Sequence, residues 1–226
     1  MTFALLLDAF LEQEMDMPDI EVLSKLTPPN VSVGLTGTRL SAILAGDTTR
    51  FYMQVSANKS FHVMNWSQYY KGEVASHHCT STLLGGVVHC SDAYPGSTSD
   101  DDIITRCGVL DKMVPGMVYL LDRGYLRAMF QASLHGVVVK TPAFLARGAD
   151  RKNVSHLTSE QAQATLDVAS PRNVIERVFG RVKSTWPWIM RVQSAVRTDV
   201  HSAVVRSCLR MTNFFGPLSN AAAENE

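Results

Sequence analysis

Several features are missing from this 226-residue sequence, and each absence excludes a class of protein. No apolar run approaches the roughly 18 to 20 residues that a membrane-spanning helix needs. Glycine and proline, at 14 and 9 residues, are not enriched, which excludes collagen and extensive disorder. No basic residue precedes Lys25, so the amino terminus lacks the basic region of a secretory signal. No cysteines form a C-x-x-C pair, and we interpret all four as buried thiols of a reducing compartment, namely Cys79, Cys90, Cys107 and Cys208.

Net charge is absent as well, because 21 Lys and Arg residues balance 21 Asp and Glu residues. Nucleic-acid-binding proteins usually carry an excess of positive charge, so this balance argues at face value against one. The charge is unevenly distributed, however. Residues 1–22 hold six acids and no base, which leaves 21 bases against 15 acids in the remainder, and residues 171–210 hold eight bases against two acids. The zero net charge therefore does not exclude DNA.

The apolar pattern predicts one α/β domain with strands in its middle and helices at its end. Residues 1–22 predict an amphipathic acidic helix. The β-prone runs 77–84 and 87–94 around Gly85-Gly86 predict a hairpin. Ser97 and Ser99 are expected N-caps of a helix that begins with aspartates. The other expected elements are a strand ending at Asp47, an extended piece at 50–55, buried strands at 117–122 and 135–142, a polar loop at 143–156, and helices at 172–186 and 199–214.

Three acidic residues stand at the predicted ends of elements that face a common edge. Asp47 follows the first strand, Asp122 follows a buried strand, and Glu176 lies on the late helix. Carboxylates gathered at strand ends lose hydration, and a divalent cation is the usual compensation. A single aspartate at a strand end is more often a turn or capping residue, so the prediction of a metal site depends on all three.

Helix geometry places two cations beside Glu176. At 100° per residue, Arg172, Glu176 and Lys183 fall within about 40° of one another, next to an apolar stripe. A carboxylate in this position could reach a metal ion across the edge of the sheet. An exposed ion pair between residues four apart fits the same spacing and remains an alternative.

Six motifs follow one another along the chain in a characteristic order. They are AGDTT at 45–49, YYKG at 69–72 followed by His77, YPGSTSD at 94–100, LLDRGY at 120–125, SPRNVIERVFGRVK at 170–183 and VVRSCLRMTNFF at 204–215. In this order they resemble the catalytic domain of PIF/Harbinger-type DDE transposases and their domesticated relatives. The resemblance covers roughly residues 40–215.

The resemblance implies an α/β, RNase H-like fold, with a mixed five-stranded sheet flanked by helices and acids at one edge. Carried over residue by residue, it implies that Asp47, Asp122 and Glu176 are catalytic and that they bind metal together with Asp100. Arg172 and Lys183 reproduce the spacing seen in related bacterial cut-and-paste transposases and are expected to contact DNA phosphates. The tyrosine that precedes this arginine there is replaced by Ala169. The neighbouring aspartates at 101 and 102 are interpreted as acids of a first helical turn.

The implied activity is cleavage of DNA phosphodiester bonds by metal-activated water, followed by joining of 3′-hydroxyl ends. This chemistry uses two Mg²⁺ or Mn²⁺ ions held by hard oxygen ligands. The implied partners are DNA, a separate Myb-like or helix-turn-helix DNA-binding protein and a second copy of the chain, with no membrane. The implied location is the nucleus for a eukaryotic source and the cytoplasm otherwise, without secretion.

The expected division is an acidic leader helix and connector at 1–39, a DDE endonuclease domain at 40–215 and a disordered tail at 216–226. A catalytically inactive, domesticated or truncated copy that acts as a DNA-associated or protein-interaction module is the alternative. Two departures from the relatives favour it. The roughly 40 residues before Asp47, the first catalytic acid, are too few and too acidic to form the helix-turn-helix region of the relatives. The interval from Asp122 to Glu176 is longer than usual, which suggests an insertion around 143–160.

A zinc site is a competing interpretation of the hairpin, because it is crowded with His77, His78, Cys79, His89 and Cys90. With Gly85-Gly86 as a two-residue turn, Thr82 would face His89 and Ser81 would face Cys90. The potential ligands would then not converge as a tetrahedral set.

Two further features allow contact with DNA. Trp186 and Trp188 could stack on a base, although packing at a helix end is favoured. The basic side chains of the polar loop could contact DNA or be solvated, and they are Arg147, Arg151 and Lys152.

Overall fold

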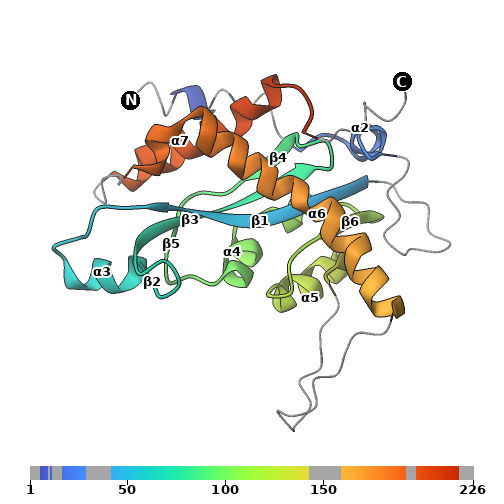
Figure 1. Ribbon diagram of the computed structural model, residues 1–226, viewed down its shortest axis with the longest axis horizontal. Helices are drawn as coiled ribbons and strands as arrows, with labels where there is room; N and C mark the ends of the chain where they lie inside the picture. The colour runs from blue at the N-terminus through green and yellow to red at the C-terminus, as the bar shows by residue number, and fades with distance from the viewer. Residues whose placement is uncertain are drawn as a thin grey trace, which may run out of the picture.

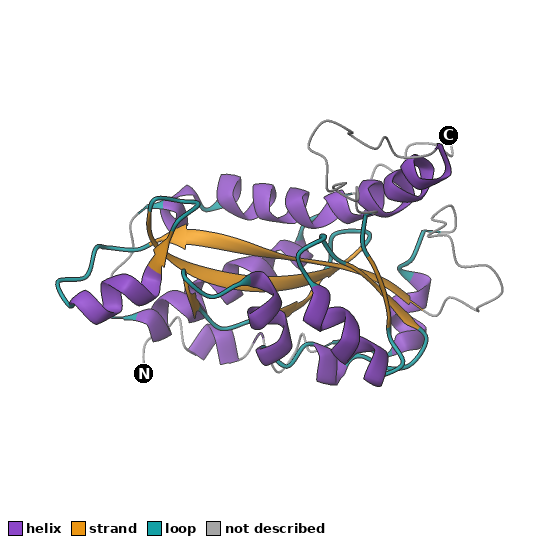
Figure 2. Cartoon of the chain, turned by 90° about the horizontal axis from the view of Figure 1, so that it is seen from below, coloured by secondary structure: helices purple, strands orange, loops and turns teal. Residues whose placement is uncertain are grey.

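A computed structural model describes residues 6–9, 11, 17–28, 42–142, 159–191 and 197–218. One mixed sheet runs through the middle of this part of the chain, with helices on both of its faces (Figure 1, Figure 2). Its strands are β1 (Ala42–Tyr52), β2 (Trp66–Ser67), β3 (Gly72–Thr82), β4 (Val87–Cys90), β5 (Tyr94–Pro95), β6 (Met117–Leu120) and β7 (Val138–Lys140).

The strand order gives the sheet its class. The main path runs β2-β3-β1-β6-β7, and the short strands β4 and β5 also pair with β3. β1 is antiparallel to β3 and parallel to β6, which is parallel to β7. The expected mixed five-stranded sheet of an RNase H-like α/β fold is therefore confirmed, with two short strands added beside β3.

The helices are α2 (Ile20–Lys25), α3 (Lys59–Asn65), α4 (Asp100–Arg106), α5 (Leu126–Leu134), α6 (Ser159–Thr185) and α7 (Thr198–Met211). Short 3₁₀ turns are η1 (Leu110–Lys112), η2 (Pro187–Met190) and η3 (Thr212–Phe214), and residues 6–9 and 11 are also helical. Within the described segments, no helix has the length and apolar character needed to cross a membrane.

Alternate residues of β1 divide the core into two layers, as expected for a strand buried on both faces. Ile43 and Phe51 pack with residues of α6 and α7 such as Ile175 and Val205. The neighbouring Leu44 belongs to the opposite layer, which contains residues of α4 and α5. Central β1 is thus held between two helical layers, which positions the polar residues it carries.

The prediction that the first strand ends at Asp47 is wrong. β1 continues to Tyr52 because its antiparallel partner β3 pairs with it from Leu44 to Tyr52. On the other side, the pairing of β1 with β6 stops at Ala45. Asp47 therefore lies where the neighbouring strand ends. The first three residues of the expected extended piece at 50–55 are the end of β1.

The predicted hairpin is present as β3 and β4, but its predicted register is wrong. Cys79 faces Cys90 and Thr80 faces His89, with a bulge between Thr80 and Ser81. The cause is a longer turn, because the N–H of Gly85 donates to the carbonyl of Thr82 at 3.0 Å and Gly85 adopts a left-handed φ of 90°.

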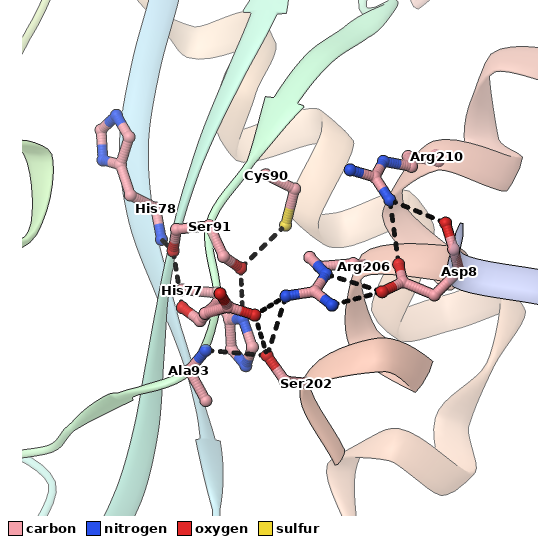
Figure 3. Close-up of polar contacts among 10 residues, drawn as sticks. Asp8, His77, His78, Cys90, Ser91, Ala93, Ser202, Arg206 and Arg210 are labelled. Atoms are coloured by element: carbon pink, nitrogen blue, oxygen red, sulfur yellow. Dashed lines mark hydrogen bonds and ion pairs between the residues drawn. The ribbon is translucent and has the colours of Figure 1, made fainter. Parts of the chain in front are cut away.

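The acidic leader is tied to α7 by ion pairs (Figure 3). Asp8 accepts hydrogen bonds from Nε of Arg206 at 3.0 Å and from Nη1 of Arg210 at 2.9 Å. Arg206 also pairs with Asp92, next to the end of β4. The prediction of one helix over 1–22 is wrong, since residues 17–19 are not helical and α2 starts only at Ile20.

The remaining predicted strands and helices are present where the structure describes them, although their bounds differ. The strands expected at 117–122 and 135–142 are the shorter β6 and β7, and the helix expected at 172–186 is the second half of α6, which begins at Ser159. Ser99 caps α4 by accepting a hydrogen bond from the N–H of Asp102 at 3.1 Å. Ser97, the other expected N-cap, does not cap α4. The predicted polar loop at 143–156 and most of the predicted tail lie outside the described residues. Of that tail, 216–218 are described, and the N–H of Leu218 donates to the carbonyl of Leu84 at 2.9 Å.

Candidate active site

The register of β1 and β6 brings two of the predicted acids to the same level. Ala45 pairs with Leu120 in parallel register. Asp47 lies two residues after Ala45, and Asp122 lies two residues after Leu120, so both lie beyond the last residues that β1 and β6 pair. Because parallel neighbours in register lie about 4.8 Å apart with side chains on the same face, the two aspartates lie close together where β6 ends, beside the middle of β1.

Asp47 is the centre of the cluster. Its Oδ1 accepts from the N–H of Thr48 at 2.8 Å and from the hydroxyl of Tyr125 at 3.4 Å, and its Oδ2 accepts from Nη1 of Arg172 at 3.3 Å. Burial raises the pKa of Asp47, and the charges of Asp100 and Asp122 raise this pKa further, against the lowering effects of the Thr48 N–H and Arg172. The site thus holds excess negative charge that a cation would stabilise.

Helix α6 brings Glu176 to the same place through Arg172. The apolar side of this helix is buried against the sheet by residues such as Ile175 and Val178. Arg172 donates from Nη2 to Oε1 of Glu176 at 2.9 Å while its other terminal nitrogen contacts Asp47. Its Nε is buried without a hydrogen-bond partner. One guanidinium therefore bridges the first and third predicted acids.

Asp100 lies beside this cluster at the start of α4. Its carboxylate pairs closely with Arg50, which follows Asp47 on β1 by three residues. Asp101 and Asp102 act differently, as the sequence indicates. Asp101 accepts from the backbone N–H groups of the first turn of α5, at 3.0 and 2.9 Å, and Asp102 pairs with Arg127 at 2.6 Å. They join α4 to α5 and lie outside the acid cluster.

Lys183 lies on α6 about 10 Å further along the helix axis than Glu176, since each residue adds about 1.5 Å. Its Nζ lies 5.6 Å from the centre of the Phe51 ring on β1, and burial lowers the pKa of its ammonium group. Arg172 contacts two of the acids, whereas Lys183 packs over this ring.

Sequence reasoning missed two groups that position the acids, Tyr125 and Arg50. The hydroxyl of Tyr125 lies between Oδ1 of Asp47 and Oγ1 of Thr48, at 3.4 and 3.2 Å. Its place in the LLDRGY motif, three residues after Asp122, is the signal that could have indicated it. Arg50 has no comparable signal, because its partner is fifty residues away.

The hairpin residues lie inside the fold. His78 contacts the Tyr119 hydroxyl through Nε2 at 2.8 Å, and Nδ1 of His77 donates to the carbonyl of Ser91 at 3.1 Å. Burial lowers the pKa of both imidazoles to about 3, so both are neutral. In the corrected register Cys79 and Cys90 face each other within the apolar core, contrary to the separation predicted for them.

The other candidates for contact with DNA are the two tryptophans and the basic residues of the polar loop. Trp186 packs against the core and its ring contacts Phe215, whereas Trp188 is half exposed. Arg147, Arg151 and Lys152 lie outside the described residues.

A divalent cation fits the chemistry of the cluster. The donors are carboxylate oxygens, which are the ligands that Mg²⁺ and Mn²⁺ prefer. The raised pKa of Asp47, caused by burial and neighbouring acids, is the situation that a bound cation reverses. Across the described segments, no three His, Cys, Asp or Glu side chains already stand in an arrangement that could hold a metal ion. The guanidinium of Arg172 stands between Asp47 and Glu176, so it must move aside for both to bind one ion.

The mixed sheet and the acids at its edge define a protein of the RNase H-like nuclease class. Residues 46–213 match the family described as DDE superfamily endonuclease, and the chain belongs to this family. The match begins one residue before Asp47 and ends within η3. No curated protein and no solved structure matches the chain. Family membership confirms the resemblance to a DDE transposase-derived nuclease and indicates a nuclease-type function with DNA as the substrate.

Proposed function

We propose that the protein is a divalent-metal-dependent DNA endonuclease that also joins 3′-hydroxyl ends. Asp47, Asp122 and Glu176 are the proposed catalytic metal ligands, and Asp100 is a fourth ligand or a support for Asp47. Two bound Mg²⁺ or Mn²⁺ ions would supply an activated water and stabilisation of the leaving 3′ oxygen. The observation that carries the proposal is the meeting of Asp47 with Asp122, Asp100 and the Arg172–Glu176 pair at one sheet edge.

The residues of the chain itself orient this site. The Thr48 N–H and the Tyr125 hydroxyl hold Oδ1 of Asp47, which fixes the direction of the other carboxylate oxygen. Arg172 pairs with both Asp47 and Glu176 in the arrangement described, and its single positive charge offsets part of their negative charge. When it moves aside, its planar guanidinium is suited to two hydrogen bonds with a DNA phosphate. Lys183, on the same helix, is proposed to contact a phosphate further along the DNA.

Cleavage of DNA by the full chain tests the proposal. DNA carrying the cognate terminal repeats should be cut with Mg²⁺ or Mn²⁺ and remain intact with EDTA. Asp47→Asn, Asp122→Asn and Glu176→Gln should each abolish cutting, because each removes a charged ligand. Asp102→Asn is the matched control, since this acid pairs with Arg127 outside the cluster. Full activity in all three variants would contradict the assignment.

A non-catalytic, DNA-associated module is the second candidate. The observation that favours it is that the guanidinium of Arg172 already forms ion pairs with Asp47 and Glu176, in the place that a metal ion would take. In that case the wild-type chain should bind DNA yet leave it uncut with either metal ion.

Membership of the PIF/Harbinger subgroup, a Myb-like or helix-turn-helix partner, self-association and nuclear location in a eukaryotic source are proposals that rest on the motif resemblance. The division into a leader at 1–39, a catalytic domain at 40–215 and a tail at 216–226 has the same status. Co-purification with tagged chain from the native cell checks the partner and the self-association together.

A further inference from the structure

One corner of the molecule combines exposed aromatic rings with an absence of acids. It is formed by the end of β1, by α3, by β2 and by the loop that leads into β3, on the left of Figure 1. Residues 48–72 contain no Asp or Glu and carry three cations, Arg50, Lys59 and Lys71. Tyr69 is 87% exposed and Tyr52 is 40% exposed. We call residues 52–72 the aromatic corner.

The rings of the aromatic corner form a continuous path to the acid cluster. The ring centres of Tyr69 and Tyr70 lie 5.0 Å apart, and those of Tyr70 and Tyr52 lie 6.2 Å apart. The guanidinium carbon of Arg50 lies 5.8 Å from the centre of the Tyr70 ring. Because Arg50 also pairs with Asp100, the path leads from Asp100, beside the proposed catalytic acids, to the exposed Tyr69.

The backbone beneath Tyr69 is held in place. The N–H of Tyr70 donates to Oγ of Ser67 and its carbonyl accepts from the hydroxyl of Tyr52, both at 3.4 Å. Lys71 adopts a left-handed φ of 52°, which turns the chain into β3. The first acid beyond the segment, Glu73, is buried and accepts from the N–H of Ser56 at 2.8 Å. Residues 48–73 therefore place no carboxylate at the surface of the corner that would repel an anionic ligand.

Exposed aromatic side chains in a segment that also carries the exposed Lys59 and Lys71 are chemically suited to one ligand class. Unpaired nucleotides present a phosphate backbone and free base faces, and aromatic side chains stack on any base. Duplex DNA hides its base faces within the helix, so it would use only the cations of the corner. A protein partner would use the apolar side chains of α3 instead, and the test below distinguishes this occupant.

We propose that the aromatic corner binds unpaired nucleotides next to the phosphodiester bond that is cut, with a base stacked on Tyr69 and phosphates contacted by Lys71 and Lys59. The proposal rests on the proposed endonuclease function, because it names the form of DNA that this site receives. Stacking itself requires no metal ion, and binding can therefore be measured apart from cleavage.

The test measures binding of a fluorescein-labelled 20-nucleotide single strand, and of the same sequence as a duplex, to the full chain in EDTA. Fluorescence anisotropy should show tighter binding of the single strand. Tyr69→Ala should weaken it by about 5- to 150-fold, the range found when a stacking aromatic is truncated, with duplex binding changed less than about twofold. Tyr69→Phe should retain the wild-type affinity. Phe130→Ala is the matched control, because Phe130 is 68% exposed on α5, away from the corner.

A second probe locates the contact on the DNA. A single 2-aminopurine placed at successive positions should be quenched at one of them by the wild type and Tyr69→Phe, and at none by Tyr69→Ala. Wild-type affinity in Tyr69→Ala, an equal loss in Phe130→Ala, or equal affinity for both DNA forms would overturn the proposal. A change in the sedimentation of Tyr69→Ala without a change in DNA affinity would also overturn it, in favour of a protein partner.

The outcomes for the two proposals are separable. If the wild type cleaves DNA and Tyr69→Ala binds the single strand with wild-type affinity, the binding site at the aromatic corner is contradicted and the endonuclease proposal stands. Single-strand binding that depends on Tyr69, together with no cleavage under any metal condition, would support the aromatic corner as a binding site and contradict the endonuclease proposal.

Discussion

Replacing Asp8 by asparagine should destabilise the fold strongly, because the ion pairs of Asp8 lie in the interior. Asp8 is 3% exposed, and its carboxylate accepts from Arg206 and from the buried Arg210 (Figure 3). The asparagine side chain would keep the shape and lose the charge, which would leave two guanidinium groups against a neutral amide. Breaking one partner of a buried ion pair costs about 3 to 5 kcal/mol.

Urea unfolding of the full chain measures this loss directly. For a chain of this size, about 3 to 5 kcal/mol corresponds to a fall in melting temperature of roughly 6 to 20 °C. Asp199→Asn is the control, because Asp199 also pairs with an arginine, at 3.2 Å, but its side chain is 56% exposed. Its replacement should cost less than about 1 kcal/mol. Equal losses in the two variants, or a loss below about 1 kcal/mol for Asp8→Asn, would refute the reasoning.

Two other variants test buried and charged groups. Burial lowers the pKa of His77 to about 3 and that of His201 to about 4, so below pH 6.5 the unfolded chain binds protons that the folded chain excludes. As the pH is lowered from 6.5 to 4, the free energy of unfolding should fall by about 1.4 kcal/mol per pH unit for each of these histidines. In urea titrations, His201→Phe should lose the contribution of one histidine to this pH dependence. A pH dependence equal to that of the wild type would contradict the prediction. Arg172→Ala removes the guanidinium that competes with a metal ion for Asp47 and Glu176, so Mn²⁺ affinity measured by calorimetry should rise a few-fold. Cleavage should fall, because the proposed contact of Arg172 with a DNA phosphate is lost. A loss of Mn²⁺ affinity would contradict the bridging role.

The acid cluster could be predicted from sequence because each acid follows from local patterns. The buried strand before Asp122 and the apolar stripe beside Glu176 are visible without a structure, and the motif order relates them to Asp47. The reason for the position of Asp47 could not be predicted. It depends on which neighbour of β1 ends first, and pairing between strands distant in sequence decides this.

Register and long-range ion pairs were also beyond sequence reasoning. The two-residue turn assumed at Gly85-Gly86 is longer in the fold, which changes the partners of Cys79 and His89. The pair of Arg50 with Asp100 joins residues fifty positions apart, and that of Asp8 with Arg210 joins residues about two hundred apart. Periodicity carries no information about such contacts, because they depend on how the layers pack.

Binding of Mn²⁺ in the absence of DNA tests the central claim most directly. Electron paramagnetic resonance follows free Mn²⁺, and titration of the full chain should deplete this signal through the carboxylates of Asp47, Asp122 and Glu176. Asp47→Asn should weaken binding at least about tenfold, since it removes a charged ligand at the centre of the cluster. Asp102→Asn, whose acid pairs with Arg127 instead, should bind as the wild type does. Identical titrations for the wild type and Asp47→Asn would contradict a metal site at this sheet edge.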